Sequence, residues 1–98
     1  RDSVDTEKVL GFKDIFPQAK EHYIFIHKEH TKNINEISRT SPEQFSEVYT
    51  EIEKFTNSNS LEENGFRVVS NVNKHGNQTV FHTHFHVLGG EQLGTHGR

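Results

Sequence analysis

Four short segments of the chain are rich in apolar, aromatic or β-branched residues and are bounded by turn-forming residues, which predicts β-strands. These segments are residues 8–15, 22–28, 65–72 and 79–88. Pro17 closes the first, Gly76 lies in the loop between the third and fourth, and Gly89 stops the last. The connection between the last two segments is short, so we expect them to pair antiparallel.

One long helix is predicted between the second and third strands. Ser41 stands at the N-cap position, Pro42 suits the first helical turn, and Gln44 completes a capping-box pattern. Apolar residues then recur at helical spacing and form one stripe toward a core: Phe45, Val48, Tyr49, Ile52 and Phe55. A short helical turn is expected over residues 33–38 and a polar loop over residues 56–60. The order strand, strand, helix, strand, strand predicts an α+β domain, with a mainly antiparallel sheet and one main helix packed on it.

The composition narrows the class of protein. A chain of 98 residues with 30% hydrophobic residues is expected to form one domain with a modest core, which a second copy of the chain could help to bury. The net charge of −3 without a basic run argues against a nucleic-acid partner. The lack of cysteine excludes disulfides and thiolate zinc sites, and no apolar stretch is long enough to span a membrane. We therefore expect a cytoplasmic protein with neither nucleic acid nor membrane as a partner.

The eight histidines are the unusual feature of this composition, and three of them fall at alternate positions of the last predicted strand. His82, His84 and His86 would share one face of that strand, with neighbours roughly 7 Å apart. The opposite face would belong to the core and consist of Phe81, Thr83, Phe85 and Val87. The three imidazoles would then point toward a cleft or solvent from a well-packed backbone.

Three interpretations of these histidines compete. They could be surface residues of a half-exposed strand, which is uncommon for three histidines in register. They could ligate zinc, although no cysteine is available and no Asp or Glu lies between Asn71 and Leu88. They could catalyse a reaction at phosphorus, in which one neutral imidazole attacks and the others donate hydrogen bonds and protonate the leaving group. Asn71, Gln78 and Thr79 flank the strand with donors suited to phosphate oxygens, which favours the third interpretation.

The segment HTHFHVL, residues 82–88, resembles the signature of the histidine triad (HIT) family, in which three alternate histidines precede two apolar residues. Thr83 departs mildly from the apolar residue usual at its position. Three blocks are similar to the family branch that hydrolyses purine nucleoside phosphoramidates: DIFPQAKEHYIFIHKEH, GFRVVSN and GNQTVFHTHFHVLGG. The resemblance implies a homodimeric α+β fold with a five-stranded type of sheet. It also implies an enzyme that hydrolyses nucleoside 5′-phosphoramidates through a nucleotidyl-histidine and releases AMP.

The same resemblance assigns roles to individual residues. His84 would be the nucleophile, His86 would help the leaving amine to depart, and His82 would orient His84. His22 would be a fourth histidine of the active site. The substrate-binding residues implied are Asn71, Gln78 and Thr79 for phosphate, Asp14 for the ribose hydroxyls, and Ile15 and Phe12 for the base. The resemblance implies no metal and no cofactor.

Several points stay open at this stage. Four histidines receive no role, namely His27, His30, His75 and His96. Relatives carry an N-terminal segment that we expect to be absent or truncated here, which leaves a single domain over residues 1–98. The tail LGTHGR also lacks a tryptophan found in some relatives, which leaves base preference and leaving group open. The alternatives are a dinucleoside polyphosphate hydrolase or nucleotidyl transferase with the same intermediate, and a non-catalytic nucleotide- or zinc-binding module.

Overall fold

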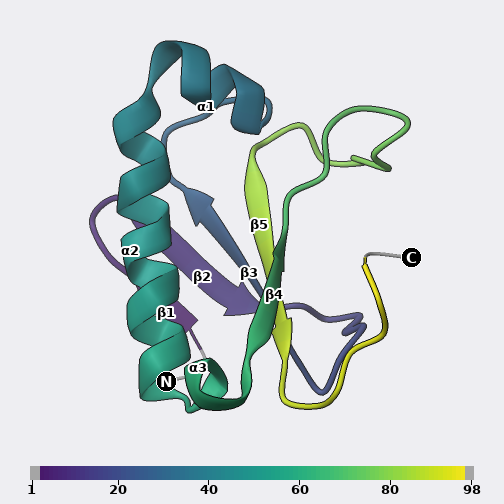
Figure 1. Cartoon of the computed structure of the whole chain (residues 1–98). Helices are drawn as coiled ribbons and strands as arrows, with labels where there is room; N and C mark the ends of the chain where they lie inside the picture. Colours follow the sequence, from purple (N-terminus) through teal and green to yellow (C-terminus); the bar gives the residue numbers. More distant parts are fainter. Residues whose placement is uncertain (1–2, 97–98) are drawn as a thin grey trace.

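The computed structural model describes residues 3–96. Within these residues there are five strands: β1 (Ser3–Asp5), β2 (Val9–Lys13), β3 (Glu21–His27), β4 (Phe66–Val69) and β5 (His84–Gly89). Three helices lie between β3 and β4: α1 (Ile34–Thr40), α2 (Pro42–Ser58) and α3 (Leu61–Asn64). The predicted α+β class is confirmed, because the long helix α2 packs along one face of a single sheet (Figure 1). Among the described residues, no helix has both the length and the apolar character needed to cross a bilayer.

The sheet has the strand order β1-β2-β3-β5-β4, and every neighbouring pair is antiparallel. The last strand, β5, therefore lies between β3 and β4 rather than at an edge. In the register of β3 with β5, Ile24 lies opposite His86 and Ile26 lies opposite His84. His22 is thus a diagonal neighbour of His86 on the same face of the sheet, and imidazoles in this relation can reach each other.

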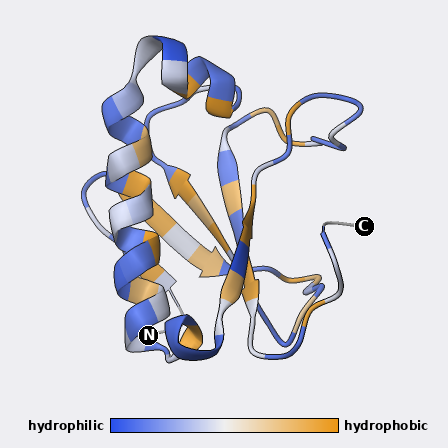
Figure 2. Ribbon diagram, viewed as in Figure 1, coloured by the Kyte–Doolittle hydropathy of each residue, from blue (hydrophilic) through white to orange (hydrophobic). Residues whose placement is uncertain are grey.

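The opposite face of β3 and β5 packs against α2 and forms the core. Its buried members are Val9, Tyr23, Phe25, Val48, Ile52, Phe55, Leu61, Phe85 and Val87. The ring of Phe55 packs against Tyr23 and Phe25, with centroids 4.6 and 5.5 Å away. Full burial of one such side chain contributes about 1.5–3 kcal/mol. Figure 2 shows the apolar stretches of β2 and β3 beside α2, and this packing holds the backbone that carries the histidines.

Gly11, in β2, lies opposite Phe25 of β3 and directly against its ring. A Cβ atom at this position would lie only 2.6 Å from Cε2 of Phe25, whose ring is fully buried. Any larger residue would push that ring out of place, since packed interiors leave no spare volume. Glycine therefore lets β2 pack directly over the Phe25 ring, and β2 ends beside Asp14.

Several predicted boundaries differ from the structure. β5 begins at His84 rather than at residue 79, and the Phe81 side chain is 54% exposed rather than part of the core. The prediction failed here because the alternating pattern continues into a segment that leaves the sheet. The predicted strand 65–72 is shorter, since β4 ends at Val69. The predicted loop 56–60 is wrong at its start, because α2 continues to Ser58.

The start of α2 was predicted correctly, but not the way it is capped. Ser41 is the N-cap residue and Pro42 lies in the first turn, yet the Ser41 side chain makes no capping hydrogen bond. The Gln44 side chain does not complete a capping box either. It donates instead to Oε1 of Glu29 at 2.9 Å, because a partner on the β3–α1 connection is within reach.

Candidate active site

His84 is the first residue of β5, and a backbone group fixes the state of its imidazole. Its Nδ1 lies 2.7 Å from the carbonyl oxygen of His82. A carbonyl oxygen only accepts, so Nδ1 of the neutral ring carries the proton and donates it to this bond. The other ring nitrogen, Nε2, then carries a lone pair. An imidazole in this tautomer can act as a nucleophile.

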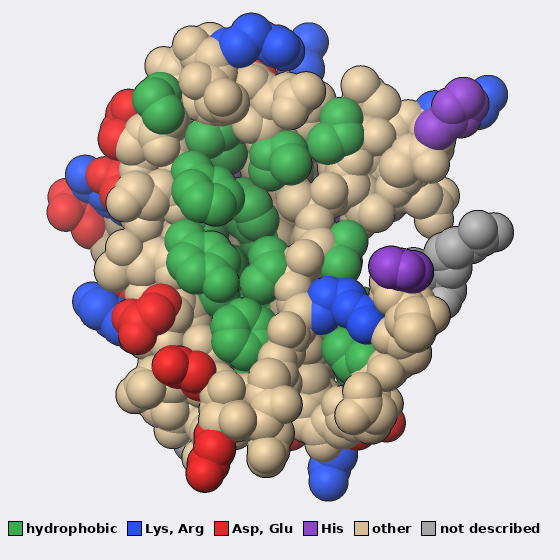
Figure 3. Space-filling model, in the orientation of Figure 1, with side chains coloured by type: hydrophobic (Ala, Val, Ile, Leu, Met, Phe, Trp, Pro, Cys, Tyr) green, Lys and Arg blue, Asp and Glu red, His purple; other side chains and the backbone are tan. Residues whose placement is uncertain are grey.

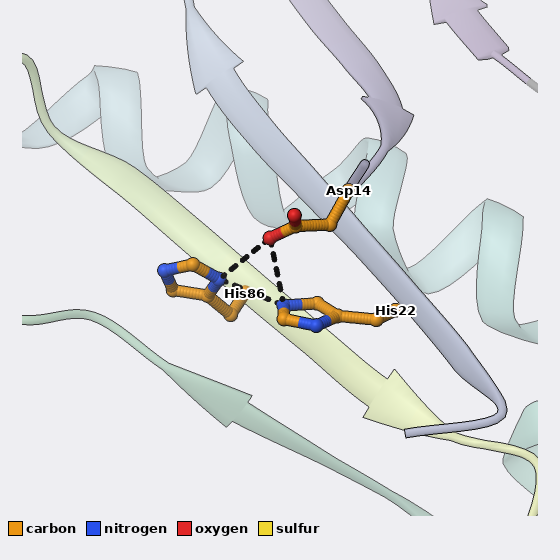
Figure 4. A group of neighbouring side chains, drawn as sticks. All are labelled: Asp14, His22 and His86. Atoms are coloured by element: carbon orange, nitrogen blue, oxygen red, sulfur yellow. Dashed lines mark hydrogen bonds and ion pairs between the residues drawn. The ribbon is translucent and has the colours of Figure 1, made fainter. Parts of the chain in front are cut away.

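Three side chains from separate parts of the chain meet beside His84: Asp14 after β2, His22 on β3 and His86 on β5 (Figure 4). Nε2 of His22 lies 2.9 Å from Nδ1 of His86. Oδ2 of Asp14 lies 3.4 Å from the His22 nitrogen and 4.0 Å from the His86 nitrogen. The backbone N–H of Gln18 donates to Nδ1 of His22 at 3.0 Å. In its neutral form His22 therefore carries its proton on Nε2 and can donate it to His86.

This bond determines which nitrogen of His86 carries a proton. Because Nδ1 of His86 accepts from His22, the proton of the neutral His86 ring stands on Nε2. The His86 and His84 rings have centroids 5.1 Å apart in an edge-to-face arrangement. A hydrogen-bond donor thus lies next to a potential nucleophile.

The burial of His22 and His86 keeps both rings neutral. Desolvation lowers the pKa of His22 below its usual value of 6.5, and the negative charge of Asp14 only partly opposes this. Desolvation also lowers the pKa of His86, and the neighbouring His84 and His22 lower it further. Both rings therefore favour the uncharged state at neutral pH, which is the state that the tautomers above require.

His22 and His86 line a cavity of about 380 Å³ between β3, β5 and β4. The other residues that line it are Gln18, Arg67, Val69, Asn71, Leu88, Leu93 and Gly94. A larger hollow of about 610 Å³ lies between α3, the start of β4 and the C-terminal tail. No histidine lines that hollow, so we place the site in the smaller one. Arg67 was not predicted, and its guanidinium donates to the Gly94 carbonyl.

Comparisons with known proteins point to one family. The profile of the HIT domain matches residues 3–93. The purine nucleoside phosphoramidase of Escherichia coli (strain K12) is 35% identical over 86 residues, which are 88% of this chain and 72% of that protein. This chain belongs to the HIT domain family.

Solved structures of HIT proteins share the fold. A HIT family hydrolase from Legionella pneumophila Philadelphia 1 has a TM-score of 0.89 and 36% identity, covering 96% of this chain and 85% of that one. A histidine triad protein from Clostridium difficile has a TM-score of 0.90 and 29% identity, covering 97% of this chain and 84% of that one. The family resemblance and the five-stranded HIT fold predicted from the sequence are therefore confirmed.

His82, the first histidine of the HIT signature, lies just before β5 rather than within it. Its Nε2 donates to the His27 carbonyl at 2.8 Å, and its Nδ1 lies 3.2 Å from Nδ1 of His30. No role was predicted for His27 and His30, yet both contact His82. The signal that could have found them is the antiparallel pairing of β3 with β5, which brings the end of one strand beside the start of the other.

Asn71, Gln78 and Thr79 belong to the connection from β4 to β5, and each of the three has different surroundings. Asn71 lines the cavity, and its side-chain amide donates to the Gly76 carbonyl at 2.7 Å. Gln78 is buried, and both ends of its amide group are bonded to backbone groups. Thr79 is exposed. Only Asn71 of the three lines the cavity, and the phosphate-binding role of all three stays a prediction.

Asp14 lies beside His22 in the same site, and two apolar residues, Phe12 and Ile15, lie close to it in the sequence. Oδ1 of Asp14 accepts from the Phe16 backbone N–H at 2.8 Å, which directs Oδ2 toward His22. The side chains of Phe12 and Ile15 are 37% and 82% exposed. They are available to a planar ligand, but their role at the base stays a prediction.

The group of Asp14, His22 and His86 could also hold a metal ion. Their ligand atoms lie within 4.8 Å of one another, and carboxylate oxygen and imidazole nitrogen are ordinary zinc ligands. Asp14 was predicted only as a ribose-binding residue, because acidic zinc ligands were sought only between Asn71 and Leu88. The aspartate comes from a part of the chain 72 residues away from His86.

Proposed function

We propose that this HIT domain hydrolyses purine nucleoside 5′-phosphoramidates through a nucleotidyl intermediate on His84 and releases AMP. The observation that carries the proposal is the bond from Nδ1 of His84 to the His82 carbonyl, because it leaves Nε2 unprotonated. The phosphoramidase of E. coli, 35% identical to this chain, supports the choice of substrate.

In the first step, Nε2 of His84 forms a bond to phosphorus while the P–N bond to the leaving amine breaks. The bridging nitrogen takes up a proton from solvent as this bond breaks, and Nε2–H of His86 donates a hydrogen bond to it, so the amine leaves as a neutral molecule. The positive charge that develops on the His84 ring is stabilised by the His82 carbonyl through Nδ1–H. In the second step, water attacks phosphorus and loses a proton to solvent. The P–Nε2 bond then breaks and AMP is released.

The remaining groups hold the substrate in this proposal. The Asp14 carboxylate accepts hydrogen bonds from the ribose hydroxyls, and Phe12 and Ile15 contact the base. Asn71 and Thr79 donate to phosphate oxygens. Gln78 acts by fixing the loop that carries Thr79, because its amide is already bonded to the backbone.

The test is His84→Ala, assayed with an adenosine phosphoramidate whose leaving group is lysine. The kcat/KM should fall by about 10⁴-fold or more, the scale of losing a nucleophile. The matched control is His75→Ala, since His75 is an exposed histidine on the β4–β5 loop. Parent enzyme denatured at alkaline pH, where the P–N bond to histidine survives, should also carry AMP on the peptide that contains His84. Activity of His84→Ala close to that of the parent would refute the assignment.

The two alternative functions separate in simple assays. A higher kcat/KM for diadenosine polyphosphates than for phosphoramidates would favour the polyphosphate hydrolase or transferase. A zinc-binding module is favoured by the cluster of Asp14, His22 and His86. Stoichiometric zinc after purification, together with loss of nucleotide binding on chelation, would support that function. Full phosphoramidase activity after exhaustive chelation would exclude it.

We further propose that the chain forms a homodimer through β4 and α2. β4 is an edge strand, and an unpaired edge is a ready template for another strand. Hydrophobic side chains gather between α2 and β4 on the face shown in Figure 3. Phe45 of α2 is 48% exposed and stacks on Tyr49. Sedimentation should show a dimer that Phe45→Glu dissociates and that Phe16→Glu, at another exposed phenylalanine, leaves intact; a monomeric parent would exclude it.

A further inference from the structure

The peptide group between His82 and Thr83 lies outside the sheet, yet it controls the nucleophile of the proposed reaction. The ladder between β3 and β5 ends at the pair Ile26 and His84, so no strand pairing holds this peptide. Its carbonyl accepts the proton of Nδ1 of His84 at 2.7 Å. Its N–H, which belongs to Thr83, donates to the Thr31 carbonyl at 2.8 Å. One peptide group thus connects His84 to the β3–α1 connection.

Two buried threonine hydroxyls lie at this junction. Thr31 and Thr83 are 5% and 3% exposed, and their Oγ1 atoms are 2.7 Å apart. Oγ1 of Thr83 also donates to the Thr31 carbonyl at 3.1 Å. Since the Thr83 hydroxyl donates its proton to that carbonyl, the Thr31 hydroxyl must donate to Oγ1 of Thr83. The Thr31 carbonyl therefore accepts two bonds from Thr83, one from its amide and one from its side chain.

Two hydrogen bonds to the Thr31 carbonyl fix the orientation of the 82–83 peptide better than one does. A single N–H bond lets the peptide plane rotate about it, whereas the hydroxyl adds a second point of attachment. Donation from the N–H also polarises the peptide and makes the His82 carbonyl a stronger acceptor. Both effects favour the proton of His84 on Nδ1. An apolar residue at position 83 would fill the same buried space without providing the second bond.

We propose that Thr83 is a positioning residue for His84: its hydroxyl and its amide hold the 82–83 peptide so that the His82 carbonyl keeps the His84 proton on Nδ1. The inference rests on the proposed nucleophilic role of His84 for its effect on rate. Its effect on the tautomer of His84 does not depend on which substrate the enzyme uses.

The experiment compares Thr83→Val, Thr83→Ser, Thr31→Val and the double valine variant. Each single valine leaves one buried hydroxyl short of a partner and should lower the Tm, whereas the double variant should recover most of that loss. The kcat should follow a different order. Thr83→Val and the double variant lose the second attachment, so their kcat should fall about tenfold. Thr83→Ser keeps the hydroxyl and should stay within about twofold, with Thr31→Val between them.

Thr56→Val is the matched control, because Thr56 is a buried threonine of α2 that donates to the Ile52 carbonyl and lies in a different element from the site. It should lower the Tm and leave kcat as in the parent. The ¹⁵N shifts of the His84 ring give a readout independent of activity: Nδ1 should be protonated in the parent and partly deprotonated in Thr83→Val.

These measurements separate failure of the inference from failure of the proposed function. A kcat that follows Tm across the variants, or a His84 tautomer unchanged in Thr83→Val, would show that the threonine pair only stabilises the fold. A parent enzyme without phosphoramidase activity would refute the proposed function, and the tautomer measurement would still decide the role of Thr83.

Discussion

Two histidines of β3 are alike in burial and in having a carboxylate nearby, but they differ in their other contacts. His22 and His27 are five residues apart, so they lie on opposite faces of the strand. Both are almost fully buried, at 4% and 6% exposure. Each has a carboxylate nearby, Asp14 at 3.4 Å from Nε2 of His22 and Glu47 at 2.8 Å from Nε2 of His27. By residue type and burial alone, either could be a catalytic histidine.

The difference lies in what remains available to react. Nδ1 of His27 accepts from the Glu29 backbone N–H at 3.0 Å, and its Nε2 donates to Glu47, so neither nitrogen is left for a ligand. Glu47 is bonded to Lys8 as well, and these two partners lower its pKa. His22 donates to a second imidazole, that of His86, and both line a cavity. A buried histidine with a carboxylate is thus part of a site only when its bonds lead to an accessible group.

The largest expected effect is a loss of activity in His22→Asn, in contrast to a loss of stability in His27→Asn. His22→Asn removes the donor that fixes the tautomer of His86, so kcat should fall by about 10²-fold, within the range for acid–base groups. His27→Asn shortens the side chain and breaks the bond to Glu47, which should destabilise the fold by about 1–3 kcal/mol. Its kcat, measured well below its Tm, should stay within about threefold, since only the His27 backbone contacts His82. Equal losses of kcat in the two variants would abolish the distinction.

The two carboxylates should differ in the same way, with a smaller effect. Asp14→Asn keeps the size of the side chain but removes the charge proposed to bind ribose, so KM should rise by about tenfold. Glu47→Gln should leave KM as in the parent, because Glu47 lies among the residues that line a different hollow, next to His27. Steady-state kinetics of both variants provides the check. A raised KM in Glu47→Gln alone would move the ligand site to that side of the sheet.

The pH dependence of stability should come from the cavity side of β3. The folded-state pKa values of His22 and His86 are below 6.5, whereas the unfolded chain has the ordinary value. Below pH 6.5 the unfolded state binds protons that the folded state does not, so the free energy of unfolding should fall as the pH falls from there. Urea titrations between about pH 7.5 and 5 test this. The change of the unfolding free energy with pH should be smaller in the double variant His22→Asn/His86→Asn. An unchanged pH dependence would show that other groups cause it.

The sequence was sufficient to predict the elements that bury one face or one stripe. The apolar stripe of α2 predicted the helix, because burial of one helix face imposes its period. The aromatic and β-branched residues of β3 predicted the central strand. β1 and α3 were missed, since three and four residues are too few to show a period. The segment before β5 was assigned to the sheet because its alternation continues past the point where hydrogen bonding to β3 ends.

Spacing along the sequence singled out candidate residues that lie close together in the chain, but it did not predict the contacts that the sheet register creates. His82, His84 and His86 were identified from their spacing, and His22 only through the family resemblance. The bond between His22 and His86 depends on a diagonal across β3 and β5, which no local pattern encodes. The support of His82 by His27 and His30 depends on the same register, as does the pairing of Thr31 with Thr83.

The smallest effect on stability is expected at the exposed ion pair between Lys8 and Glu47, next to His27. Lys8 is exposed and lies 2.9 Å from Oε2 of Glu47, which raises the pKa of Lys8. Lys8→Gln should lower the Tm less than His27→Asn does, because exposed ion pairs contribute little. The difference from the parent should vanish near 1 M salt, where charges are screened within about 3 Å. If Lys8→Gln instead lowered the Tm as much as His27→Asn at high salt, the ion pair would not explain the loss. The stability of the fold around His27 would then depend on the packing of the aliphatic part of Lys8 rather than on the hydrogen bond between His27 and Glu47.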